Sequence, residues 1–147
     1  FLDIVEGVYL HYQKRLYDNN QIDFADMINE AAEFLTSEHA EQINLDYKYI
    51  IIDEFQDIAR QRFDFAKVLA ARTNAKITAV GDDWQSIFAF AGSDITLFTR
   101  FIELMGSGEE MKITHTYRNS QQLIDIAGQF VQKNANQIKK SCKDRRV

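Results

Sequence analysis

The chain has 147 residues, of which 46% are hydrophobic and 27% are charged, a balance typical of a folded globular domain. Its formal net charge of −5 argues against a chain that grips nucleic acid as one basic surface. A single cysteine, Cys142, excludes an internal disulfide and fits a reducing compartment such as the cytoplasm, and no apolar run approaches the ~20 residues that span a bilayer.

Helical periodicity dominates the first third of the chain. Apolar residues recur at helical spacing over 3–17, "DNNQ" at 18–21 interrupts them, and a second helix is expected from Phe24 to about Leu35. A polar connection then leads to the apolar segment 48–52, which we predict to be a buried strand.

Strands and helices alternate from this point onward. The expected elements are a helix over 58–72, a strand over 76–81, a helix over 94–105 with Asp94 as its N-cap, and a strand over 111–115. A last helix is expected from about Asn119 to 134, opened by a capping box of Asn119 and Gln122. The residues predicted to face inward on it are Leu123, Ile124, Ala127, Phe130 and Val131. This order predicts an α/β fold in which helices flank a parallel sheet.

Polar clusters follow the end of each predicted strand: Asp53–Glu54, Gly81–Gln85 and Tyr117–Arg118. Because the ligands of parallel sheets bind at the carboxyl ends of the strands, we expect the three clusters to meet at one edge.

The side chains of these clusters suit the phosphates of a nucleotide. Asp53 can hold Mg²⁺ through its water shell, and Glu54 can orient or deprotonate an attacking water. Gln85 can hydrogen-bond a terminal phosphate, and Arg118 can stabilise charge that develops there. Tyr117 offers a flat face for a base. A metal and a positioned water are recurring parts of phosphoryl-transfer sites.

Each residue also has an ordinary structural interpretation. An Asp-Glu pair after a strand is commonly a solvated loop or a helix N-terminus, a Gln after Gly-Asp-Asp commonly belongs to a turn, and a lone Arg commonly forms a surface ion pair. The combination at three successive strand ends favours the nucleotide site.

Three segments carry a family resemblance. "IIIDEFQD" (50–57), "AVGDDWQSIFAFAGSD" (79–94) and "THTYRNS" (114–120) resemble, in order and spacing, motifs of the superfamily 1 DNA helicases of the UvrD/Rep/PcrA type. The wording "VGDDWQSI" is most similar to the helicase IV branch, and "IDFADMI" (22–28) resembles the segment that returns the chain to the first motor domain.

This resemblance implies a RecA-like P-loop NTPase motor that couples ATP hydrolysis to movement along single-stranded DNA and to duplex unwinding, with ATP and Mg²⁺ as cofactors and roles such as DNA repair. Asp53 would then be the Mg²⁺-associated carboxylate, Glu54 the catalytic base and Gln85 the γ-phosphate sensor. Arg118 would be the arginine finger in the cleft between two motor domains, and Tyr117 would stack near the adenine.

The resemblance also places aromatic residues against DNA. Phe88 and Phe90 occupy positions that stack on bases in the family, where each stacked base is worth about 1–3 kcal/mol. Alternating aromatics in an apolar stretch are also common in cores, so the core interpretation stays open, and Trp84 is expected to pack inward. The basic segment 139–146 can meet phosphates or form a solvated or disordered end.

Two departures from the family pattern limit what carries over. Ala91 stands where the family often has an arginine, and no GxxxxGK[ST] loop occurs in the 147 residues. We therefore expect a fragment: 1–20 as the end of inserted accessory helices, 21–117 as the back half of the first motor domain, and 118–147 as the start of the second. The remaining motor domains of the same protein would be its partners, and the isolated chain is predicted to be inactive.

Two other classes of protein compete with the motor interpretation. A metal-dependent nuclease or phosphatase would use a cluster of carboxylates, namely Asp53, Glu54, Asp57, Asp82 and Asp83. A degenerate module would only grip DNA or a protein partner.

Overall fold

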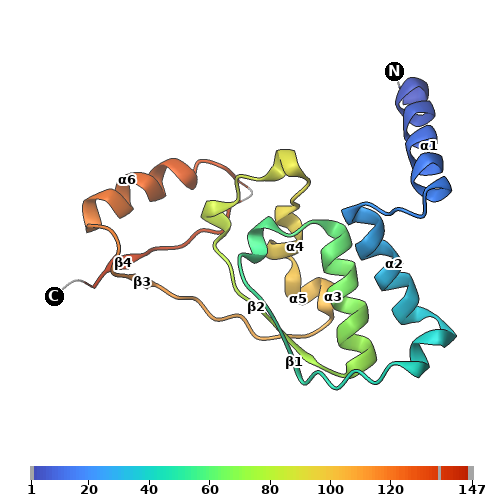
Figure 1. Cartoon of the computed structure of the whole chain (residues 1–147). Coiled ribbons are helices and arrows are strands. Elements are labelled where there is room, and N and C mark those ends of the chain that lie inside the picture. Colours follow the sequence, from blue (N-terminus) through green and yellow to red (C-terminus); the bar gives the residue numbers. More distant parts are fainter. Residues whose placement is uncertain (1, 136, 146–147) are drawn as a thin grey trace. The chain divides into compact units, whose positions relative to one another are not determined.

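The structure is a computed structural model that describes residues 2–135 and 137–145 (Figure 1). It divides into two compact units, one formed by residues up to 50 together with 61–76, the other by residues 51–60 and those from 77 onward. Across the described residues, no helix is both long enough and apolar enough to cross a membrane.

The first unit is helical. Helix α1 (Leu2–Asp18) ends where Asn20 adopts a left-handed backbone, with φ of 51°, and the amide of Gln21 donates to the carbonyl of Leu16. Helix α2 (Phe24–Thr36) opens on a capping box of Asp23 and Asp26. The predicted helices and the interruption between them are confirmed.

Side chains tie α1 to α2 within this unit. The Tyr12 hydroxyl donates to Asp23 Oδ2 at 3.1 Å, and Gln13 Nε2 donates to Asp26 Oδ1 at 3.3 Å. Helix α3 (Arg60–Thr73) buries Phe63, Ala66 and Ala70, as its sequence pattern predicts.

The second unit holds the carboxyl ends of strands β1 (Tyr49–Ile52) and β2 (Lys76–Ala79), which are hydrogen-bonded neighbours. The amide of Lys76 donates to the carbonyl of Lys48, and the amide of Val80 donates to that of Ile52. The donor and the acceptor are separated by the same number of residues in both bonds, as expected for two parallel strands. The expectation of a buried first strand is wrong for one face, because Ile51 is 74% exposed.

Phe55 is the centre of the second unit's core. It is fully buried, its ring meets that of Phe101 edge-on at 5.2 Å, and its amide donates to the carbonyl of Val80 at 2.9 Å. Leu97 is also fully buried. Phe55 comes directly after Asp53 and Glu54 in the chain, so its burial in this core anchors the segment that follows β1.

The predicted helix over 94–105 is two short helices, α4 (Ile95–Thr99) and α5 (Phe101–Met105). Asp94 caps α4, as expected, by accepting from the amide of Thr96. Arg100 breaks the helix: its backbone leaves helical dihedrals, with φ of −112° and ψ of 20°, and its guanidinium pairs with Glu103 in the next turn.

The third predicted strand is wrong in extent and in partner. Strand β3 covers only His115–Thr116, and it pairs in parallel with β4 (Lys143–Asp144), which the sequence did not predict. The described strands therefore form two separate two-stranded sheets and not one three-stranded sheet. The reason is a contact between distant parts of the chain: the amides of Lys143 and Arg145 donate to the carbonyls of Thr114 and Thr116.

Helix α6 (Gln121–Val131) lies beside β4, and it starts later than predicted (Figure 1). Its N-cap is Ser120, and the expected capping box does not form. Gln121 is instead drawn toward β4, where its Oε1 accepts from the amide of Asp144 at 2.9 Å.

The inward face predicted for α6 is only partly confirmed: Ile124 and Val131 are half-buried, whereas Leu123, Ala127 and Phe130 are exposed. The side of α6 that packs within the chain is the one at Gly128, where a Cβ would come within 2.9 Å of the Trp84 ring.

Candidate functional site

Asp53 and Glu54 lie at the carboxyl end of β1, as predicted, and both are exposed. The amide of Glu54 donates to Asp53 Oδ1 at 2.9 Å. Glu54 adopts a left-handed backbone, with φ of 50° and ψ of 41°, which is uncommon for a residue with a Cβ. The chain turns sharply here, between the end of the strand and the buried Phe55.

Gln56 links this carboxylate pair to the second cluster. Its side chain is 1% exposed, its Nε2 donates to Glu54 Oε2 at 2.7 Å, and its Oε1 accepts from the amide of Asp82 at 2.9 Å. Both ends of the carboxamide are thus satisfied by residues that follow different strands. Sequence reasoning did not assign Gln56 to the site, and its place between Phe55 and the charged Asp57 gives no sign that it is buried.

Gly81 makes room for this bridge. A Cβ on Gly81 would lie 2.6 Å from Gln56 Oε1 and 2.8 Å from Phe98 Cε2, which is closer than real side chains approach. The glycine that ends the second strand is therefore required by close packing, and its φ does not demand it.

Gln85 joins the network through Asp82. Asp82 caps a 3₁₀ turn over Asp83–Gln85, since its Oδ1 accepts from the amide of Trp84 at 3.2 Å. Its Oδ2 accepts from Gln85 Nε2 at 2.8 Å. Glu54 and Gln85, predicted from separate motifs, are thereby connected by hydrogen bonds through Gln56 and Asp82.

Lys140 sets the electrostatics of the second cluster. Its ammonium donates to Asp82 Oδ1 and, at 2.8 Å, to Asp83 Oδ1. Burial favours the neutral amine, but the hydrogen bonds and charges of the two carboxylates outweigh it and raise the pKa of Lys140. Burial likewise opposes the Asp82 carboxylate, yet bonds from Gln85 and Lys140 outweigh it and lower the pKa of Asp82.

The basic segment 139–146 is therefore more ordered than predicted over its described part. Residues 143–144 form β4, and Lys140 is held by an ion pair. Arg146 lies outside the described residues.

Tyr117 and Arg118 follow β3, and both are exposed. The amide of Arg118 donates to Thr116 Oγ1 at 3.3 Å. Within 2–135 and 137–145, no hydrogen bond or ion pair connects these two residues to Glu54 or Gln85. The structure thus assembles two of the three predicted clusters, and the third stands on the separate β3–β4 sheet.

Phe88 and Phe90 lie side by side, with ring centroids 5.9 Å apart and planes inclined by 50°. Phe90 is 86% exposed, so the core interpretation is wrong for it, and Phe88 is 42% exposed. Trp84 does pack inward, with its Nε1 donating to the carbonyl of Ile138 at 3.2 Å.

The carboxylates do not gather as a multi-carboxylate metal site requires. In the described part of the chain, no group of three or more His, Cys, Asp or Glu side chains has that arrangement. Asp82 and Asp83 face Lys140, and Glu54 faces Gln56. This geometry favours the nucleotide site over the nuclease or phosphatase interpretation.

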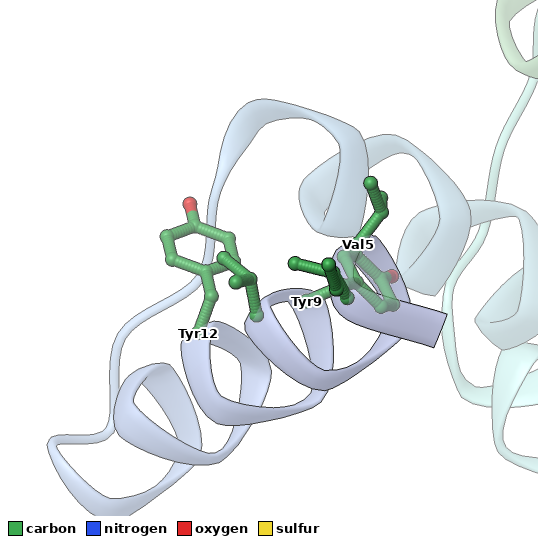
Figure 2. A pocket seen from close by; sticks show the side chains of 5 residues that line it. Val5, Tyr9 and Tyr12 are labelled. Atoms are coloured by element: carbon green, nitrogen blue, oxygen red, sulfur yellow. The ribbon is translucent and has the colours of Figure 1, made fainter. Parts of the chain in front are cut away.

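One hollow in the molecule contains none of the predicted site residues. It is an open apolar surface on α1, lined by Ile4, Val5, Val8, Tyr9 and Tyr12 (Figure 2). It offers packing surface, and the polar side-chain atoms of its lining are the hydroxyls of Tyr9 and Tyr12, of which that of Tyr12 donates to Asp23.

The UvrD/REP helicase N-terminal domain family matches residues 2–105, and the chain belongs to this family.

Among similar proteins, DNA helicase IV of Escherichia coli (strain K12) is 41% identical over 125 residues, covering 82% of this chain and 17% of the relative. The ATP-dependent DNA helicase PcrA of Bacillus subtilis (strain 168) is 30% identical over 140 residues, covering 94% of this chain and 19% of the relative. The chain thus spans less than a fifth of the length of either relative.

Proposed function

We propose that this chain is part of an ATP-dependent DNA helicase and supplies the water-activating and phosphate-sensing side of its ATPase site. The observation that carries the proposal is the hydrogen-bonded connection from Glu54 through Gln56 and Asp82 to Gln85. It joins a candidate base and a candidate phosphate sensor at the ends of two parallel strands, where nucleotides bind. Membership of a helicase family supports the same function.

The residues present fit ATP with Mg²⁺. Asp53 is an exposed carboxylate, and its Oδ1 accepts one hydrogen bond, from the amide of Glu54. Its remaining oxygen lone pairs can accept from the water shell of a magnesium ion. When bound, Mg²⁺ would neutralise charge on the phosphates. No glycine-rich phosphate loop occurs in these 147 residues, and in this proposal another part of the protein would supply the cradle for the phosphates.

Glu54 and Gln85 would both act at the terminal phosphate. Glu54 holds one oxygen against Gln56 and would accept the proton of the attacking water. Gln85 would donate its carboxamide hydrogens to a phosphate oxygen, oriented by its bond to Asp82. Arg118 would reach the developing charge, and Tyr117 the base, once the segment after β3 approaches the site.

Phe88 and Phe90 are proposed to stack on bases of single-stranded DNA. Their exposed, adjacent rings support this role. Phe90→Ala in the whole protein should weaken binding of a single-stranded oligonucleotide, measured by fluorescence anisotropy. An unchanged Kd would remove Phe90 from the DNA site.

The boundaries 1–20, 21–117 and 118–147 remain our proposed division into accessory helices and two motor domains, which the rest of the protein would complete. A cytoplasmic location and a role in DNA repair belong to the same proposal.

The deciding experiment is Glu54→Gln in the whole protein. This variant keeps the shape of the side chain and loses the base, so DNA-stimulated ATP hydrolysis should fall by about 10²-fold or more while binding of single-stranded DNA persists. Unaltered turnover would exclude Glu54 as the base.

A further inference from the structure

We propose that Lys140 is a positioning residue for Gln85, acting through the Asp82 carboxylate, and that it links the phosphate-sensing turn to the chain segment that carries Arg118. The proposal rests on the function proposed above for Gln85. It concerns a residue outside the three motifs that point to the site.

The first support is the arrangement of charges around Lys140. Its side chain is 21% exposed, and it faces Asp82, at 38%, and Asp83, at 2%. A carboxylate as buried as that of Asp83 needs a cation and hydrogen bonds to remain charged. Lys140 supplies the cation, and the amide of Ile138 donates to Asp83 Oδ2 at 2.6 Å.

The second support is that the contact is reciprocal. While Ile138 donates to Asp83, its carbonyl accepts from Trp84 Nε1, and the Lys140 ammonium lies 4.9 Å from the centroid of the Trp84 ring. Gly128 on α6 lets the same ring approach closely. We call this contact of residues 138–140 with Asp82, Asp83 and Trp84 the clasp.

The clasp controls the orientation of the sensor. The two Asp82 oxygens have different partners: Oδ1 accepts from Lys140 and from the amide of Trp84, and Oδ2 accepts from Gln85. Fixing one oxygen fixes the plane of the carboxylate, and therefore the direction in which it holds the Gln85 carboxamide. Without Lys140, two adjacent carboxylates would lose their cation, and Asp82 Oδ1 would keep only the 3.2 Å bond from the Trp84 amide, so the carboxylate would be held less firmly.

The clasp also continues into the third cluster. A few residues after Lys140 the chain enters β4, which pairs with β3, and Arg118 follows β3 by two residues. A displacement of Arg118 with its sheet would therefore be transmitted to Lys140, and through Asp82 to Gln85.

The first experiment tests the clasp in the 147-residue chain itself. Trp84 is the only tryptophan, so tryptophan fluorescence reports on the surroundings of this one ring. Lys140→Ala should shift the Trp84 emission to longer wavelength and increase its quenching by acrylamide. Lys139→Ala removes the same charge from the exposed neighbouring residue and should leave both unchanged, and Lys140→Arg should largely preserve them. Wild-type emission and quenching in Lys140→Ala would overturn the clasp.

The second experiment tests positioning in the whole protein. Lys140→Ala should lower kcat for DNA-stimulated ATP hydrolysis by about tenfold with little change in KM for ATP, because the sensor is misoriented while nucleotide contacts remain. Lys140→Arg should recover most of the loss. In a Gln85→Ala background, Lys140→Ala should cause no further loss.

The outcomes separate the two proposals. If Lys140→Ala still lowered kcat tenfold in the Gln85→Ala background, Lys140 would not act through Gln85. A wild-type kcat in the single variant Lys140→Ala would also overturn the positioning role. If the wild-type protein had no ATPase activity, the proposed function itself would fail and the role of Gln85 with it, whereas the Trp84 signal would still decide whether the clasp exists. Circular dichroism of Lys140→Ala and Lys140→Arg identifies any variant that fails to fold.

Discussion

Glu54 combines a proposed chemical role with a strained backbone. Its left-handed conformation costs a residue with a Cβ roughly 1–2 kcal/mol, a cost that glycine avoids. Residues held in such conformations are concentrated at functional sites. The strain comes from the sharp turn that exposes Glu54 while burying Phe55 and Gln56.

This strain can be measured with a matched pair of variants. Glu54→Gly and Glu54→Ala both remove the carboxylate and its bond to Gln56, but only glycine relieves the backbone. We expect Glu54→Gly to unfold at a higher denaturant concentration, by about 1 kcal/mol in free energy of unfolding. Equal stability of the two variants would mean that the turn relaxes and stores no strain.

Gly81 offers a second test, of the connection between the two clusters. Gly81→Ala places a methyl group against Gln56 and Phe98, so we expect a loss of about 1–3 kcal/mol in the free energy of unfolding. Gly7→Ala is the control, because nothing lies within 4 Å of its Cβ and a helix interior favours alanine by up to about 1 kcal/mol. A Gly81→Ala variant as stable as Gly7→Ala would contradict the packing described here.

Individual residues of the site differ in how far sequence could predict them. Asp53, Glu54 and Gln85 follow strands whose ends are visible in the apolar pattern, and a parallel pair brings such ends together. Gln56 and Lys140 carry no such signal, because their partners depend on which loops meet. Lys140 is 57 residues from Asp83 in the chain, and no local pattern encodes that contact.

At the scale of elements, periodicity and caps predicted the helices, and pairing was the source of error. Apolar spacing located α1, α2 and α3, and Asp94 marked the start of α4. The two-residue strands β3 and β4 are too short to show alternation. They form because the segment after α6 folds back and pairs with Thr114 and Thr116, which is a tertiary contact between residues distant in the sequence.

The clasp between the last segment and the 3₁₀ turn should depend on pH at both extremes. The pKa of Asp82 is lowered, so its contribution is complete above the ordinary value of 3.8 and is lost as pH falls through the folded pKa. The pKa of Lys140 is raised, so its contribution is complete below the ordinary value of 10.5 and is lost as pH rises through the folded pKa.

Trp84 emission should therefore be constant between about pH 5 and 9 and change only outside this range. A titration of the chain followed by fluorescence measures this directly. In Lys140→Ala the alkaline transition should disappear, because its ammonium is gone. A transition near neutrality would show that another group controls the contact.

At the scale of the whole molecule, the described chain exposes apolar surfaces that its sequence marks as core. Ile51 on β1, Phe24 on α2 and Phe130 on α6 are each more than half exposed. The chain spans less than a fifth of the length of the two helicase relatives compared above. An apolar pattern predicts that a face is covered and does not say by which segment, so these three exposures could not be predicted from the sequence.

The proposed division into motor domains predicts the activity of the isolated chain. Glu54 and Gln85 are present and connected, but no residues of the chain form a glycine-rich loop that would hold the β- and γ-phosphates. Most of the affinity for ATP should come from such a loop, so the purified 147-residue chain should show neither tight ATP binding nor DNA-stimulated hydrolysis. Phosphate release and fluorescent-nucleotide titration measure both. Circular dichroism and the Trp84 emission must first show that the chain is folded. Hydrolysis that DNA stimulates and Glu54→Gln abolishes would prove that the chain holds a complete site, and the proposed division into motor domains would then be wrong.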